Sequence, residues 1–151
     1  AIVPKLLGWK ESAIRERVEA VLTLTGLDPG EFIDRFPDQL SGGQRQAVGV
    51  ARALAGDPPI ILMDEPFGSL DPITRDQFQR MFLDVESIVK KTVLFVTHDV
   101  MEALRLGDRI AIIDEGRLVQ VARPRELIEN PATEFVREFI SHHTIQDGSL
   151  W

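Results

Sequence analysis

The sequence has no cysteine, little positive charge and no long apolar run, and each lack excludes a class of protein. Without cysteine, the 151 residues form neither disulfides nor thiolate metal sites, an absence that suits a reducing cytosol. A net charge of −7 argues against a nucleic-acid partner, which would require a basic patch. No apolar run approaches the roughly 20 residues that span a bilayer. A role at a membrane would therefore need a separate membrane-spanning partner.

The chain does have enough length and hydrophobic content, 44%, to bury the core of one domain. Its most informative stretch, residues 40–72, is LSGGQRQAVGVARALAGDPPIILMDEPFGSLDP. Ser41 is a suitable helix N-cap, and Gly42 and Gly43 allow backbone N–H groups to approach an anion closely. Helix formers and apolar residues at helical spacing predict a helix over residues 44–55.

Residues 56–59, GDPP, cannot continue that helix. The apolar run over residues 60–63 predicts a short strand buried on both faces, as in a parallel sheet. Asp64 and Glu65 follow at its carboxyl end, where open α/β sheets place ligands. Taken alone, two carboxylates in this position could simply cap the next turn.

The remaining sequence predicts further helices and strands around this stretch. We expect a helix capped by Ser12 and stopped at Gly26, and a short helix within residues 31–36. The further predicted elements are a helix over 73–89 capped by Asp71, a strand over 92–96, a helix over 99–105, a hairpin of 109–113 with 117–121, and helices from 124 and from 131 or 132. The predicted domains are a helical subdomain over residues 1–56, an α/β part over 57–140 and a flexible tail over 141–151.

Four motifs in this order resemble the ATP-binding-cassette (ABC) family of transporter ATPases. LSGGQ resembles the family signature, IILMDE its Walker B strand and SLDP, residues 69–72, its D-loop, while His98 matches the switch histidine. The resemblance extends from near residue 1 to about Ile140. It implies an α/β fold, namely the C-terminal part of a P-loop NTPase core with the inserted helical subdomain.

The resemblance also implies a role for each motif in ATP hydrolysis. Asp64 would hold Mg²⁺, Glu65 would orient and deprotonate the attacking water, and His98 would contact the γ-phosphate. ATP held by an opposite subunit would be bound by Ser41, Gly42, Gly43 and Gln44. Asp71 would reach across the same dimer, although it is also a good local N-cap.

No G-x-x-x-x-G-K-[ST] loop, which cradles the phosphates of ATP, occurs in the 151 residues. We therefore interpret the chain as the C-terminal portion of a longer ATPase and expect it to be inactive alone. A non-catalytic truncated cassette that binds a partner is the alternative. Chromosome-maintenance and repair ATPases share a related signature but require long heptad arms and basic charge, which are absent here.

The segment VPKLLGW near the start and residues 109–140 are similar to the glycine betaine, carnitine and choline (osmoprotectant) importers of this family. The resemblance implies an ATPase subunit that lies peripherally on the cytoplasmic face of the cell membrane. Its expected partners are a second copy of the subunit, transmembrane permease subunits and, indirectly, a solute-binding protein.

Overall fold

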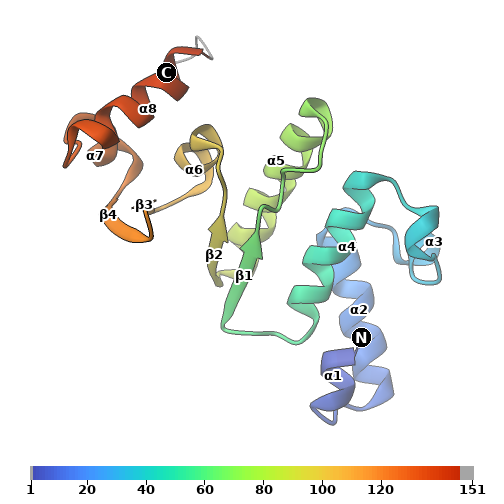
Figure 1. The fold of residues 1–151 in the computed structure, drawn as a ribbon. Coiled ribbons are helices and arrows are strands. Elements are labelled where there is room, and N and C mark those ends of the chain that lie inside the picture. Colours follow the sequence, from blue (N-terminus) through green and yellow to red (C-terminus); the bar gives the residue numbers. More distant parts are fainter. Residues whose placement is uncertain (1, 147–151) are drawn as a thin grey trace. The chain divides into compact units, whose positions relative to one another are not determined.

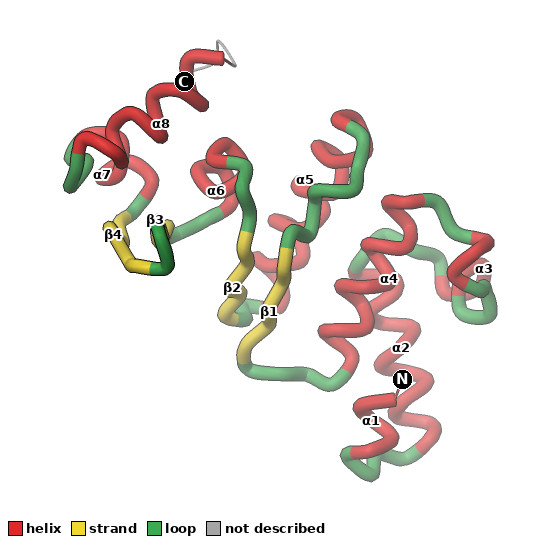
Figure 2. The backbone as a smooth tube through the Cα atoms, in the orientation of Figure 1, coloured by secondary structure: helices red, strands yellow, loops and turns green. Residues whose placement is uncertain are grey.

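The computed structural model describes residues 2–146, which form a mixed α/β fold as predicted (Figures 1 and 2). The chain divides into two compact units, residues 1–96 and 97–151. The first unit contains α1 (Ile2–Leu6), α2 (Glu11–Leu24), α3 (Pro29–Phe32), the 3₁₀ turn η1 (Pro37–Gln39), α4 (Gly42–Ala55), β1 (Ile60–Asp64), α5 (Pro72–Val89) and β2 (Thr92–Val96). The second contains α6 (Val100–Leu106), β3 (Ile110–Asp114), β4 (Arg117–Ala122), α7 (Pro124–Glu129) and α8 (Glu134–Gln146). The boundary predicted after residue 56 lies inside the first unit and stays a prediction.

Helices α2 and α4 pack along each other in the first unit (Figure 1). Both carry apolar residues at helical spacing, and the buried ones are Ile14, Val21 and Leu22 of α2 and Ala47, Val50, Ala51, Leu54 and Ala55 of α4. The start of α2 differs from the prediction, because Lys10 rather than Ser12 is the N-cap. The first turn of α2 is exposed, so water can satisfy its N–H groups without a side-chain cap.

The helix predicted within residues 31–36 begins earlier and is shorter. Asp28 accepts a hydrogen bond from Gly30 N at 2.9 Å and caps α3, whose first residue is Pro29. The chain is extended again at Phe36, with φ −85° and ψ 156°, because the following proline disfavours helical backbone there.

Strands β1 and β2 form a parallel two-stranded sheet, with Leu62 opposite Leu94. Helix α5 connects them and packs on one face through aromatic side chains. Phe67, which is 1% exposed, lies 5.9 Å from Phe78 and 6.1 Å from Phe82 of α5, and 6.3 Å from Phe95 of β2, measured between ring centroids.

The prediction that β1 is buried on both faces is wrong for the described chain. Its residues alternate, with Ile61 buried and Ile60 and Leu62 exposed, and β2 alternates in the same way. The reason is that α5 covers one face of the sheet, whereas the outer face keeps apolar side chains accessible.

A cluster of charges joins α2 to the beginning of both strands. Arg17 Nη2 donates to Leu54 O at 2.7 Å and lies 3.3 Å from Asp57 Oδ1. Lys91 Nζ lies 3.0 Å from the same carboxylate oxygen. The hydrogen bond and positive charge of Lys91, helped by Arg17, hold the pKa of Asp57 below its ordinary value.

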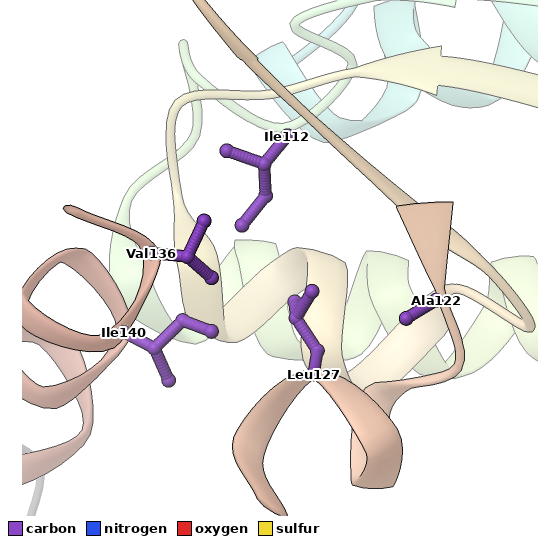
Figure 3. Close-up of a cluster of buried hydrophobic side chains, with 5 residues drawn as sticks. All are labelled: Ile112, Ala122, Leu127, Val136 and Ile140. Atoms are coloured by element: carbon purple, nitrogen blue, oxygen red, sulfur yellow. The ribbon is translucent and has the colours of Figure 1, made fainter. Parts of the chain in front are cut away.

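The second unit is built on a β-hairpin and three helices. Its hairpin has the predicted turn, with Glu115 and Gly116 at φ 45° and 74°. Five side chains form its core (Figure 3), namely Ile112, Ala122, Leu127, Val136 and Ile140. Helix α8 continues to Gln146, beyond residue 141, where the flexible tail was predicted to begin. The flexibility of that segment stays a prediction. Residues 147–151 of the predicted tail lie outside the described residues.

Candidate functional site

The carboxyl end of β1 presents Asp64 and Glu65 side by side in the chain, in two different environments. Asp64 is exposed, whereas Glu65 is half-buried and has left-handed backbone, φ 46°. Its N–H donates to Val96 O at 2.9 Å, and its carbonyl accepts from Gly68 N at 3.3 Å. Left-handed backbone is unfavourable for a residue with a Cβ, and such strain gathers at functional sites.

The loop after Glu65 is anchored in the core. Pro66, Phe67 and Leu70 are buried, and the rings around Phe67 pack edge to face. The loop also lies close to the glutamate, since a Cβ on Gly68 would be 3.5 Å from Glu65 Oε2. The buried side chains after Glu65 and its two backbone hydrogen bonds thus anchor this turn.

The glycine turn begins α4 as predicted. Ser41 is the N-cap, its Oγ accepts from Gln44 N at 3.3 Å, and Gln44 Oε1 accepts from Ser41 N at 2.9 Å. This reciprocal capping box holds the first turn in place. The N–H groups of Gly42 and Gly43 belong to that turn, where an α-helix provides no intrahelical acceptors and an anion is favoured.

The glycine turn touches the segment that follows the Walker B-like strand. A Cβ on Gly43 would lie 2.7 Å from Thr74 Cγ2, and one on Gly42 would lie 3.8 Å from Leu70 Cδ2. Gln46 Nε2 donates to Ser69 Oγ at 3.3 Å. The structure therefore brings the predicted signature and D-loop residues together in one unit.

Asp71 is the N-cap of α5 as predicted, and Pro72 occupies the first helical position. Its Oδ1 accepts from Thr74 N at 3.1 Å. Hydrogen bonds from the Thr74 side chain and N–H lower the pKa of Asp71, so this exposed carboxyl is ionised at neutral pH.

His98 belongs to the second unit and is exposed at the start of α6. Thr97 and Asp99 flank it and order the turn. Thr97 Oγ1 donates to Glu102 Oε2 at 2.7 Å, and Asp99 Oδ1 caps α6 by accepting from Met101 N at 2.9 Å. The predicted contact of His98 with the γ-phosphate stays a prediction.

Sequence motifs did not single out Gln46 or Thr74. The sequence did carry a signal that some residue approaches Gly43 closely. One capping residue suffices to start a helix, so the second glycine of the signature indicated such an approach, and the structure shows that Thr74 makes it. Nothing in the sequence indicated the hydrogen bond between Gln46 and Ser69, because it joins residues 23 apart.

In the described part of the chain, no three His, Asp or Glu side chains gather as a metal site. Asp64 alone is nevertheless consistent with Mg²⁺ that arrives on nucleotide phosphates, because such an ion needs one or two carboxylates and fills its other positions with phosphate and water. Within residues 2–146 no helix has both the length and the apolar character needed to cross a bilayer.

Comparison with known proteins identifies the family. The ABC transporter family model matches residues 3–68. The chain is 51% identical over 99% of its length to an osmoprotectant import ATP-binding protein of Salmonella typhimurium, of which it covers 38%. It is 54% identical over 93% of its length to a glycine betaine/carnitine/choline transport ATP-binding protein of Bacillus subtilis, covering 37%, and 51% identical over 99% to a choline transport ATP-binding protein of the same organism, covering 39%.

The chain thus spans between a third and two fifths of the length of these relatives. The matched lengths include the glycine turn, the carboxyl end of β1 and residues 69–74, where the structure shows a capped helix start and a glutamate in left-handed backbone. On both grounds, this chain belongs to the ABC transporter family and is similar to the ATP-binding subunits of osmoprotectant importers.

Proposed function

We propose that this chain is part of the ATP-hydrolysing subunit of an ABC importer for quaternary amine osmoprotectants such as glycine betaine. The observation that carries the proposal is the left-handed backbone of Glu65 at the carboxyl end of β1, directly after Asp64. Backbone strain of this kind is found at functional sites, and here it falls on the carboxylate residue that follows the strand. The solute class rests on the names of the relatives, which transport osmoprotectants, glycine betaine, carnitine and choline.

In this proposal the site residues divide the work of phosphoryl transfer. Asp64 holds Mg²⁺ on the terminal phosphates of ATP, Glu65 orients and deprotonates the attacking water, and His98 contacts the γ-phosphate. Positioning and charge stabilisation supply most of the rate in this chemistry. A chain without the phosphate-cradling loop therefore has no measurable turnover, which calorimetry and a phosphate-release assay with Mg-ATP on residues 1–151 would check.

The proposed subunit works as a head-to-tail dimer. The N–H groups of Gly42 and Gly43, together with Ser41 and Gln44, bind the phosphates of ATP held by the second copy, and Asp71 reaches across the same interface. The dimer couples ATP binding and hydrolysis to transmembrane permease subunits on the cytoplasmic face of the membrane. A solute-binding protein delivers the solute to the permease, and no nucleic acid takes part.

The experiment that tests the function is the substitution Glu65→Gln in the complete subunit. It keeps the shape of the side chain and removes the base, so we expect turnover to fall by about 100-fold or more while ATP stays bound and the ATP-bound dimer accumulates. Asp108→Asn, at an exposed carboxylate of the second unit, is the matched control and should leave turnover unchanged. Wild-type turnover in Glu65→Gln would overturn the proposed role of Glu65. A complete wild-type subunit that showed no turnover would instead favour the non-catalytic, partner-binding cassette.

A further inference from the structure

The glycine turn and residues 69–74 are held together more closely than either local structure requires. A capped start of α4 would form with any small residue at position 43, and Asp71 would cap α5 without any contact to α4. Yet the methyl group of Thr74 occupies the space in which a Cβ at residue 43 would lie, at 2.7 Å. A separation below 3.0 Å requires something to shift, so the present distance between the two segments needs glycine at position 43.

Thr74 joins the two segments through its side chain and its backbone. Its methyl group lies against Gly43, whereas its N–H donates to Asp71 Oδ1 at 3.1 Å. One turn further along α4, Gln46 Nε2 donates to Ser69 Oγ at 3.3 Å. Leu70 is buried, and a contact holds the residue on each side of it. Ser69 is bonded to α4 through Gln46, and Asp71 is bonded to Thr74, which lies against Gly43 of α4.

We propose that Thr74 and Gln46 are positioning residues that hold Ser69 and Asp71 in fixed register against the glycine turn. The turn and residues 69–71 then meet a second subunit as one surface, so that binding of the phosphates and docking of Asp71 occur together. The proposal rests on the proposed function, because the register matters only if both segments act across a dimer. A purely structural contact would add stability and nothing more.

The first test is a rescue experiment in the complete subunit carrying Glu65→Gln. Gly43→Ala should weaken the ATP-dependent dimer about tenfold, as the overlap with Thr74 pushes the segments apart. Thr74→Ser removes the obstructing methyl group and keeps the hydroxyl, so adding it to Gly43→Ala should restore most of the affinity. Gly49→Ala is the matched control, because a Cβ there meets nothing within 4 Å and should leave the dimer unchanged.

Three readouts separate a positioning role from a structural one. Light scattering against ATP concentration reports the dimer, a fluorescent ATP analogue reports binding by single subunits, and the thermal midpoint reports stability. We expect the affinity of single subunits for the ATP analogue to stay constant in all variants. The loss of dimer affinity in Gly43→Ala should be larger than its change in thermal midpoint accounts for. Failure of Thr74→Ser to rescue Gly43→Ala would overturn the proposal, since the Ala methyl group would then be obstructing the partner directly.

The second test is a double-mutant cycle between Gln46→Leu and Ser69→Ala. Each change alone should weaken the dimer several-fold, and the double variant should be no weaker than the worse single one, because both remove the same hydrogen bond. Additive losses would overturn the role of Gln46. If the Glu65→Gln parent itself forms no ATP-dependent dimer, both the proposed function and the positioning role are wrong. If the parent dimerises but Thr74→Ser does not rescue Gly43→Ala, only the positioning role is wrong.

Discussion

At the scale of single residues, Glu65 shows how strain and function coincide. A residue with a Cβ in left-handed backbone costs roughly 1–2 kcal/mol, a cost that glycine avoids. We therefore expect Glu65→Gly to raise the free energy of unfolding of the chain by about 1 kcal/mol, measured by urea denaturation. Glu115→Gly, at φ 45° in the hairpin turn, is the matched control and should stabilise to a similar degree.

The two glycine variants should differ in activity. In the complete subunit Glu115→Gly should keep normal turnover, and Glu65→Gly should lose it, because only the second removes the proposed base. A destabilised Glu65→Gly variant would mean that contacts of the side chain outweigh the strain of the backbone.

Asp57 should make the free energy of unfolding of the chain depend on pH in the acidic range. The Lys91 hydrogen bond and charge lower its pKa in the folded state, so its stabilising contribution is complete above the ordinary value of 3.8 and is lost as pH falls through the lower, folded-state value. The effect should be small, because Asp57 is 54% exposed and salt screens the pair. In thermal melts between pH 5 and pH 3, Asp57→Asn should lose less stability on acidification than the wild type, and an unchanged slope would contradict this account.

At the scale of elements, local sequence signals predicted where helices and strands lie, but they did not predict which faces of those elements are buried. Asp71 marked the start of α5 correctly, because a capping side chain acts within a few residues of the helix that it begins. The face that β1 exposes could not be predicted from its apolar run, since burial depends on what packs against the strand. For the same reason, the second glycine of the signature indicated a close approach at Gly43, but the sequence could not identify Thr74 as the residue that makes it.

The five-residue core of the second unit should depend strongly on Leu127, which is 1% exposed. Its replacement by alanine removes buried methyl groups and leaves a cavity, at a cost of about 2–5 kcal/mol. Leu118→Ala is the control, because that side chain on β4 is 63% exposed and should cost little. Hydrogen exchange would localise the effect, with faster exchange in β3, β4 and α7 for Leu127→Ala and little change in β1 and β2.

At the scale of the whole molecule, the outer face of the β1–β2 sheet should govern how the 151-residue chain behaves in solution. Ile60, Leu62, Leu94 and Val96 are between 56% and 73% exposed. Leu62 and Leu94 are register partners, so their side chains lie next to each other on the sheet. Parallel sheets normally have both faces covered, and exposed apolar patches and open strand edges promote association.

We therefore expect the purified chain to self-associate with rising concentration, through this face or through the open edges of the two strands. A lysine at Leu62 or Leu94 should shift the equilibrium toward monomer, because its charge opposes both face packing and edge pairing. Ile73→Lys is the matched control, since Ile73 is 74% exposed on α5 and lies outside the sheet. Light scattering after size exclusion measures the mass, and a wild-type chain that stays at its monomer mass of 16.9 kDa at all concentrations would contradict the prediction. If Ile73→Lys dissolved the oligomer as well as the sheet variants did, the association would depend on overall charge and not on the sheet.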